Sequence, residues 1–409
     1  AGTTIKVMPG VYTENLIMRT SGEAGAPISL TSVDGPASVT ITPKSDEYDT
    51  IAVGGRDHIV IDGVTIQAPT TTSMNGVAIY ARQSSDVFDI ASYVTVSNTV
   101  ILGGEGDGIK GSKAEHLTIV DNTISQSTGG EEGIDFVGVN NSVISGNTIT
   151  DINNIGIMVK GGSTGIKITD NHISGTGSSG VEVGGYTELP FYFPGFLDNF
   201  AYEIKDVVVS GNLISDTGGT ALRLIGAQNV SVTGNEINNA ENYVIAIDDS
   251  SKFHDVWTSQ DIEITGNSFD AEDWLENRSD GLNISESDNF VDGRELVVPT
   301  PAEASTGLLQ IMPNAAVAEE SLASGHDVQL DPNVIDLGVL GASDDVTTSR
   351  TKDDAVVFKI VGIDGLPDLI FESSGREVLT GLNAHQAQWS TLTIKDVSLH
   401  EWSGDIAFA

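Results

Sequence analysis

The sequence has no cysteine, few basic residues and no long apolar run. Without cysteine, neither disulfides nor thiol chemistry are available to its 409 residues. Only 19 Lys and Arg stand against 58 Asp and Glu, so the formal net charge is -39. A surface of that charge repels nucleic acid and anionic membranes, and we exclude both as partners. No apolar run reaches membrane-spanning length, so we expect no membrane insertion.

One short phrase recurs between residues 93 and 269. In each copy, alternating apolar residues lead into an Asn, and Ile or Phe follows two residues later. An earlier copy carries Thr99 in place of the Asn. The gaps between successive Asn residues are 25, 24, 41, 23 and 32 residues, for Asn122, Asn147, Asn171, Asn212, Asn235 and Asn267. A period of about two dozen residues with short strands and a recurrent turn residue indicates a solenoid.

The composition of the repeat favours strands over helices. Gly, Thr, Val, Ile and Asn dominate, and apolar residues alternate as they do in a half-buried strand. Asn tolerates left-handed backbone angles at a corner, and Asn side chains stacked in successive coils can form a hydrogen-bonded ladder. We therefore predict an all-β chain whose main domain is a right-handed parallel β-helix. A β-sandwich with coincidental spacing is the alternative.

These repeats resemble the right-handed parallel β-helix superfamily of carbohydrate-active proteins, over roughly residues 1–300. We predict a β-helix domain at 1–298, a linker at 299–305 (PTPAEAS) and a small β-rich domain at 306–409. The opening, Thr4–Tyr12, is similar to the second strand of a first coil, so we expect a processed or truncated start. The ending resembles the tails of type I secretion cargo, which predicts an extracellular protein, although the glycine-rich calcium nonapeptides of that cargo are absent.

Three segments interrupt the period. Residues 186–203 carry seven aromatic side chains, and residues 250–260 carry His254 and Trp257. We interpret Glu272–Arg278 as a short helix or a loop. We interpret Asp107, which lies between two glycines, as a turn residue.

A second strand in each copy has paired apolar residues, such as Val181 and Val183, that point inward. The residue between them then points outward, and successive coils stack about 4.8 Å apart. The predicted outward column is Ala78, Lys110, Asp135, Met158, Glu182, Arg223 and Ala246. The predicted flanking column is Tyr80, Ser112, Val137, Lys160, Gly184, Ile225 and Asp248. We expect one charged strip on this face, walled by the aromatic insertion and made of Lys110, Asp135, Lys160, Glu182 and Arg223.

The first functional hypothesis is a lyase that cleaves a uronate-containing, acidic polysaccharide. β-Elimination needs a base for the C5 proton and a positive group for the neighbouring carboxylate. Lyases of the superfamily that this chain resembles use Lys or Arg as the base, often with Ca²⁺ held by clustered acids. The resemblance implies Lys160 or Lys110 as the base and Arg223 as the neutralising group. Candidate Ca²⁺ ligands are Glu131, Glu132, Asp135 and Asp248, and candidate substrate contacts are Asp135, Glu182, Tyr80, Tyr192, Phe193 and Phe196.

Other interpretations of the same strip stay open. A C5-epimerase would use the same proton abstraction. An inverting glycoside hydrolase is a second hypothesis, because Asp135 and Glu182 should lie two coils, or about 9.6 Å, apart. A third is a non-catalytic, calcium-binding surface, adhesin or matrix protein. The charges could also only pair with each other on a solvated face, Lys110 with Asp135 and Glu182 with Arg223.

Overall fold

The computed structural model divides the chain into two units, Ala1–Val297 and Val298–Ala409. In the first unit it describes residues 2–83, 88–193, 196, 200–252, 255–271, 274–291 and 294–295. In the second it describes six strands between residues 335 and 399. The predicted linker at 299–305, His254 and the last residues of the secretion-like ending, 400–409, lie outside the described residues.

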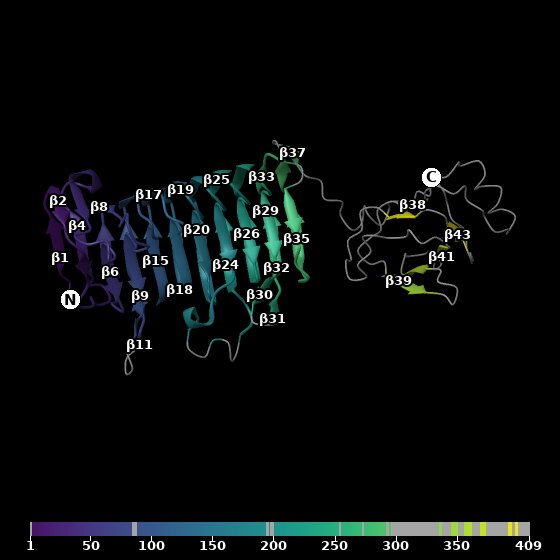
Figure 1. Cartoon of the computed structure of the whole chain (residues 1–409), viewed down its shortest axis with the longest axis horizontal. Helices are drawn as coiled ribbons and strands as arrows, with labels where there is room; N and C mark the ends of the chain where they lie inside the picture. The colour runs from purple at the N-terminus through teal and green to yellow at the C-terminus, as the bar shows by residue number, and fades with distance from the viewer. Residues whose placement is uncertain are drawn as a thin grey trace. The chain divides into compact units, whose positions relative to one another are not determined.

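The first unit is a solenoid whose coils each contribute strands to three faces (Figure 1). In one representative coil these are β20 (Ile157–Lys160), β21 (Ser163–Thr169) and β22 (His172–Thr176). Each strand pairs in parallel with its equivalent in the next coil, β23 (Val181–Gly184), β24 (Ile204–Ser210) and β25 (Leu213–Thr217). This parallel stacking confirms the predicted β-helix, because every coil repeats the alternation that buries one side of each strand.

The first face carries the predicted charged strip. Along the solenoid it is built from β3 (Leu16–Ile17), β6 (Ile51–Gly54), β9 (Val77–Tyr80), β15 (Ile109–Glu115), the first part of β18 (Ile134–Ser145), β20, β23, β26 (Leu222–Ile225), β29 (Ile245–Asp248) and β34 (Leu275–Asn277).

The second and third faces close each coil. The second is built from β1 (Thr4–Val7), β4 (Ile28–Ser32), β7 (Ile59–Asp62), β12 (Ala91–Ser92), β13 (Val94–Ser97), β16 (Thr118–Val120), the end of β18, β21, β24, β27 (Ala227–Thr233), β32 (Gln260–Thr265) and β35 (Ile284–Ser287). The third is built from β2 (Gly10–Thr13), β5 (Val39–Thr42), β8 (Thr65–Gln67), β14 (Val100–Leu102), β17 (Thr123–Ser127), β19 (Thr148–Ile152), β22, β25, β28 (Glu236–Ala240), β33 (Ser268–Phe269), β36 (Phe290–Val291) and the antiparallel β37 (Arg294–Glu295).

Short elements decorate the coils. They are the hairpins β10 (Arg82–Gln83) with β11 (Phe88–Asp89) and β30 (Ser250–Lys252) with β31 (Asp255–Trp257), and the 3-10 turns η1 (Pro36–Ser38) and η2 (Leu189–Phe191). The described strands of the second unit are β38 (Ile335–Leu337), β39 (Asp345–Arg350), β40 (Val356–Val361), β41 (Leu369–Ser373), β42 (Leu392–Ile394) and β43 (Val397–Leu399), all in antiparallel pairs.

The core is a column of stacked Ile, Val and Leu side chains inside the coils. The inward residues of β23 and β26, such as Val181 and Leu222, are fully buried, as the predicted alternation requires. Phe136 and Phe269 are the largest fully buried side chains. Burial of this apolar surface holds each coil against the next.

The repeated Asn residues form the predicted ladder. Each side-chain amide donates to the Oδ1 atom of the next Asn along the solenoid, at 2.9–3.0 Å, from Asn122 to Asn289. Asn289 extends the ladder one coil beyond the predicted repeat. The left-handed backbone, however, falls one residue before the ladder, at positions such as Asp170 (φ 56°) and Gly211 (φ 64°). The preceding Asp or Gly therefore makes the corner, and the ladder Asn bonds across it.

The interpretation of Glu272–Arg278 as a short helix or a loop is wrong for its centre. β34 (Leu275–Asn277) is a first-face strand that pairs in parallel with β29. The coil continues here because Leu275 packs against the core and Trp274, 6% exposed, stacks on Phe269. The first face is therefore one coil longer than the sequence pattern indicated.

Candidate functional site on the first face

The register of the first face agrees with the predicted columns. Lys110 pairs with Asp135, Asp135 with Met158, and Met158 with Glu182. Glu182 in turn pairs with Arg223. Met158 thus occupies the strip on β20, while Lys160 stands two residues further along, in the flanking column that also holds Val137. These strip residues come from successive coils and share one face.

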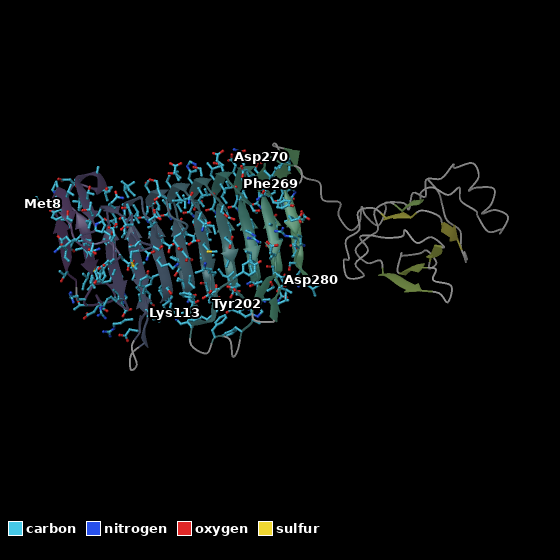
Figure 2. All side chains as sticks on the ribbon, viewed as in Figure 1. Met8, Lys113, Tyr202, Phe269, Asp270 and Asp280 are labelled. Carbon is cyan, nitrogen blue, oxygen red and sulfur yellow. The ribbon has the colours of Figure 1, made fainter. Side chains whose placement is uncertain are left out.

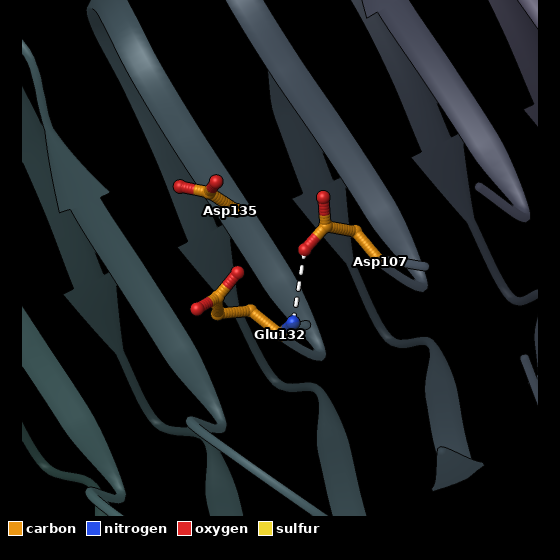
Figure 3. A group of neighbouring side chains, drawn as sticks. All are labelled: Asp107, Glu132 and Asp135. Carbon is orange, nitrogen blue, oxygen red and sulfur yellow. Dashed lines mark hydrogen bonds between the residues drawn. The ribbon is translucent and has the colours of Figure 1, made fainter. Parts of the chain in front are cut away.

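Three carboxyl groups gather at the start of β18. Oxygens of Asp107, Glu132 and Asp135 lie within 4.8 Å of one another, and all three residues are buried. Asp107 and Glu132 each lie two residues before a first-face strand, in neighbouring coils, and the Glu132 backbone N–H donates to Asp107 Oδ1 at 2.9 Å (Figure 3). Lys110 Nζ bonds Asp135 Oδ2 and lies 3.1 Å from Asp107 Oδ2. The Lys110 ammonium group therefore forms ion pairs with two of these three neighbouring carboxylates.

Asp107, Glu132 and Asp135 form what we call the acidic cluster. Their crowding and burial set the protonation of its carboxyl groups. Burial, reinforced by the charge of Asp135, raises the pKa of Glu132 to about 9 and that of Asp107 to about 6. Burial alone would lower the pKa of Lys110, but the charges of Asp135 and Asp107 outweigh it and raise that pKa above its ordinary value. At neutral pH, Glu132 holds a proton and Lys110 is charged. A lysine held in this way is unsuited to act as a base.

The acidic cluster fits a hard cation in the type of its ligands. Carboxylate oxygens are the ligands that Ca²⁺ prefers, and Asp135 Oδ1 is buried without a hydrogen-bond partner among the described residues. Of the predicted ligands, Glu132 and Asp135 belong to this cluster, whereas Glu131 is not part of it. Asp107 joins them instead, so its interpretation as a turn residue missed this role.

Tyr80 lies one coil before Lys110, beside the acidic cluster. Its hydroxyl accepts a hydrogen bond from Asn75 Nδ2 at 2.5 Å. Asn75 Oδ1 accepts a hydrogen bond from the Asp107 backbone N–H at 3.1 Å. Burial, followed by the charge of Asp49, raises the pKa of Tyr80 above its ordinary value, so the phenol stays protonated and can donate.

A second charged group lies at the other end of the strip. Arg223 Nε donates to Asp248 Oδ2 at 2.9 Å, and its Nη1 lies 3.9 Å from Glu182 Oε2. Arg278 binds the same Asp248 carboxylate at 2.7 Å through Nε and at 3.1 Å through Nη2. Asp248, a predicted metal ligand, is thus bonded by two guanidinium groups. Sequence reasoning missed Arg278, although aligning Leu275 and Asn277 with the paired apolar residues of earlier coils would have placed it on this face.

Lys160 lies between these two groups. Its Nζ contacts Met158 Sδ at 2.9 Å, and among the described residues no carboxylate lies within salt-bridge distance of it. Glu182 is on the next coil, and burial raises the pKa of its carboxyl more than the charges of Arg223 and Lys160 lower it. The centre of the strip therefore holds an unpaired amine beside a carboxyl that favours its protonated form.

Acidic and basic side chains differ in exposure along the strip. The carboxylate side chains of Asp135 and Glu182 are 1% and 8% exposed, whereas Lys110 and Arg223 are 20% and 30% exposed. Arg278 reaches 46%. Despite the chain's net charge of -39, the groups that this face offers to solvent are largely basic.

The aromatic insertion does not present all of its rings to the strip. Tyr192 and Phe196 are 4% and 8% exposed, and Tyr192 packs edge-on against Trp257 of the second insertion, with ring centroids 5.8 Å apart. Phe193 is half-buried against the same cluster. Tyr192 and Phe196 are buried against each other and have little surface open to solvent. The substrate contacts predicted for these two rings are therefore not supported by their positions.

The insertion is fastened to the edge of the solenoid. Lys113 Nζ donates to the Pro190 carbonyl at 2.8 Å, and Figure 2 shows Lys113 and Tyr202 along the same edge of the first unit. Glu203, fully buried, accepts hydrogen bonds from the backbone N–H groups of Thr187 (3.0 Å) and Gly161 (3.3 Å). These bonds fix both ends of the insertion beside the first face.

A separate hollow of about 550 Å³ lies at the corner between the third and first faces. Glycines such as Gly175 and Gly177 leave it open, and Asp151, Asp216 and Glu241 line it. No Lys or Arg is among its lining residues. An anionic sugar would be repelled there, so we place the candidate site on the strip.

Comparison with known proteins settles the handedness of the fold. Residues 44–192 match the family described as right handed beta helix region. The first unit is therefore folded as a right-handed parallel β-helix. The chain is 31% identical over 180 residues to the uncharacterized protein YwoF of Bacillus subtilis strain 168, a match that spans 39% of this chain and 37% of YwoF. The chain thus covers little more than a third of that relative's length.

Solved β-helix structures are similar in fold. The A-module of mannuronan C-5 epimerase AlgE4 from Azotobacter vinelandii shares 17% identity at a TM-score of 0.51, over 71% of this chain and 86% of that one. Tailspike protein 2 of Escherichia coli O157:H7 bacteriophage CAB120 shares 10% identity at a TM-score of 0.52, over 96% of this chain and 59% of that one. At these identities the likeness shows the fold alone. In the described part of this β-helix, no helix has the length and apolarity that crossing a bilayer requires.

Proposed function

We propose that the first face removes the C5 proton of a uronate residue in an acidic polysaccharide, and that the outcome is lyase cleavage. The observation that supports this most is the central pair on the strip. The amine of Lys160, which has no carboxylate partner among the described residues, lies beside the buried carboxyl of Glu182, whose pKa is raised, and Arg223 is next to that carboxyl. Base, acid and cation are the three groups that β-elimination needs. The AlgE4 module, named as a mannuronan C-5 epimerase, supports polysaccharide chemistry on this scaffold.

Arg223 and Arg278 bind and polarise the substrate carboxylate in this proposal. Both guanidinium groups are partly exposed and already bond Asp248, so a substrate carboxylate can share them. Neutralising that carboxylate stabilises the negative charge that develops when the C5 proton leaves. Arg is suited to this task because its planar fork matches a carboxylate.

Lys160 acts as the base and Glu182 as the acid. The Lys160 amine takes the proton from C5, and the electrons of the C5–H bond form the C4–C5 double bond. The C4–O bond breaks, and the leaving oxygen takes a proton from Glu182, whose pKa is raised by burial, which favours the protonated form of the carboxyl. Lys110 is not used as the base, because Asp107 and Asp135 hold it as a cation.

A divalent cation would bind at the acidic cluster. Asp107, Glu132 and Asp135 are the residues that would hold it, and a bound Ca²⁺ would supply further positive charge toward the substrate carboxylate. The roles of Lys160, Glu182 and Arg223 do not depend on it. We also propose that the protein works outside the cell, where such polymers are found.

Hydrolysis is the second candidate, and one observation favours it. Asp135 and Glu182 are separated by a single intervening strand, β20, so they lie two coils apart as an inverting pair requires, and Glu182 favours its protonated form. The pairing of Asp135 with Lys110 argues against it, because Asp135 would need free access to a water molecule.

Product analysis separates these reactions. Purified protein is incubated with alginate, pectate and glycosaminoglycan chains, with and without Ca²⁺. A lyase gives an unsaturated product that absorbs in the ultraviolet, an epimerase changes the sugar composition without cleavage, and a hydrolase gives new reducing ends without unsaturation. Absence of any change on all of these polymers would refute the proposed chemistry.

A further inference from the structure

Asp248 lies on β29 between two arginines of the first face. β29 pairs on one side with β26, which carries Arg223, and on the other side with β34, which Arg278 directly follows. Asp248 Oδ2 accepts hydrogen bonds from Arg223 Nε at 2.9 Å and from Arg278 Nη2 at 3.1 Å. Asp248 Oδ1 accepts a third bond from Arg278 Nε at 2.7 Å. The two guanidinium groups therefore converge on one carboxylate, and on one of its oxygens in particular.

Arg278 is held from two further directions. Its backbone N–H donates to the Ile247 carbonyl at 2.8 Å, which continues the pairing of β34 with β29. Its guanidinium carbon lies 5.9 Å from the centre of the Tyr243 ring, within the range of a cation–π contact. The side chain nevertheless remains 46% exposed. Arg278 is thus fixed in place and still open to solvent.

The bonds to Asp248 leave the outer part of each guanidinium group free. Arg223 donates through Nε alone, so its two terminal nitrogens make no hydrogen bond to any of the described residues. Arg223 Nη1 lies 3.9 Å from Glu182 Oε2, which is too long for a hydrogen bond. Arg278 donates through Nε and Nη2 and keeps Nη1 free in the same part of the structure. An anion that reaches this face therefore finds unused donors on two converging guanidinium groups.

The Asp248 carboxylate also limits the charge of this group. Two guanidinium groups and one carboxylate leave a single net positive charge, which matches one uronate carboxylate. The Asp248 side chain is only 11% exposed, so both of its effects, on orientation and on charge, reach a substrate through the arginines. Planar guanidinium forks favour a carboxylate only when their N–H groups are aimed at it, so their orientation matters for recognition.

We propose that Asp248 is a positioning residue, which holds Arg223 and Arg278 so that their free N–H groups receive one uronate carboxylate together. The proposal rests on the function proposed above, because it concerns recognition of the same carboxylate. Without the charge of Asp248, the general attraction of this end of the strip for an anion persists, whereas the directed hydrogen bonds are lost.

Binding of a uronate trisaccharide at two salt concentrations tests this role. The full chain is titrated by calorimetry at low temperature in EDTA, as wild type and as Asp248→Asn, which keeps the shape of the side chain but removes its charge. At low salt the variant should bind at least as tightly as the wild type, because one more positive charge is left unpaired. At high salt, where that attraction is screened, it should bind about tenfold more weakly, because about one hydrogen bond to a charged group is lost.

Asp121→Asn is the matched control, since it makes the same change at an exposed carboxylate away from the first face. It should follow the wild type at both salt concentrations. Weaker binding of Asp248→Asn at low and high salt alike, or binding equal to the wild type at both, would overturn the positioning role. So would a wild-type protein that does not bind the trisaccharide.

Arg278→Lys provides a second test that does not depend on the folding of Asp248→Asn. It keeps the charge of an exposed side chain but not the fork that bonds Asp248. Binding should weaken at high salt only, and combining the two variants should weaken it little further, because both break the same contact. Unchanged binding by Arg278→Lys, or losses that add fully in the double variant, would contradict the proposal.

Turnover separates this proposal from the proposed chemistry. On a polymer that the wild type cleaves, Asp248→Asn should lower kcat by about tenfold to a hundredfold without raising KM at low salt, because the substrate is bound but misplaced. If the predicted salt dependence is found and no polymer is turned over, only the chemistry fails. If a polymer is cleaved and Asp248→Asn matches the wild type in binding and rate, only the positioning role fails.

Discussion

Replacing the ladder residue Asn171 with alanine should lower the free energy of unfolding of the β-helix by about 2–6 kcal/mol. The Asn171 amide donates to the Ile144 carbonyl at 3.0 Å and to Asn212 Oδ1 at 2.9 Å. Its Oδ1 accepts the backbone N–H of Asn147 at 3.0 Å and the Asn147 side-chain amide at 2.9 Å. Four buried hydrogen bonds are lost in this variant.

The magnitude follows from the partners that are left behind. Asn212 Oδ1 still accepts the backbone N–H of residue 171, and the Asn147 amide still reaches the Ile119 carbonyl. The Ile144 carbonyl and the Asn147 backbone N–H lose their ladder partner, and each buried unsatisfied group costs about 1–3 kcal/mol. Two such groups give the stated range.

Urea unfolding, followed by circular dichroism, measures this effect against a matched control. His172, the next residue, is exposed, so His172→Ala should change the stability by less than about 0.5 kcal/mol. If Asn171→Ala is no more destabilising than His172→Ala, the ladder does not hold the coils in register, and the argument from register to the charged strip loses its basis.

Three further predictions concern the strip. Lys110→Met should destabilise the fold by about 3–5 kcal/mol, because the Asp135 carboxylate stays buried without its partner. Lys160→Met should instead remove turnover and change the stability by less than about 1 kcal/mol. Thermal unfolding and rate assays compare the two variants, and equal destabilisation would contradict the separate roles of the two lysines. Folding raises the pKa of Glu132 from 4.5 to about 9, so the folded state loses stability as the pH rises through that range. In EDTA, the stability of Glu132→Gln relative to the wild type should therefore increase progressively from about pH 5.5 to 8.5. If the stability gained by Glu132→Gln does not change with pH, the raised pKa of Glu132 is refuted. Added Ca²⁺ should raise the melting temperature of Asp121→Asn but much less that of Asp135→Asn; equal increases would mean that the ion binds elsewhere.

Much of the scaffold could be predicted because its signals are local and repeated. Alternation along each strand fixes which residues point inward, and the recurrent Asn fixes how one coil stacks on the next. This was enough to place Lys110 beside Asp135 and Glu182 beside Arg223. The coil of β34 was missed because only Leu275 carries the apolar pattern there.

The details of the site depend on contacts between coils that no local pattern encodes. Asp107 precedes its strand as an ordinary turn residue would, and only the stacking of the next coil brings it to Glu132 and Asp135. The aromatic insertion was predicted as a wall, but Tyr192 and Phe196 bury their surface against each other and Trp257. Hydrophobic burial within the insertion decides that outcome, and composition alone does not reveal it.

Loss of deuterium from C5 of a labelled polyuronate tests the proposed chemistry most directly, since lyase and epimerase reactions both break that bond and hydrolysis does not. The wild-type protein should release the label into water, and Lys160→Ala, with its folded state verified by circular dichroism, should not. Cleavage of the polymer with the label retained, or equal release by wild type and Lys160→Ala, would contradict proton abstraction by this face.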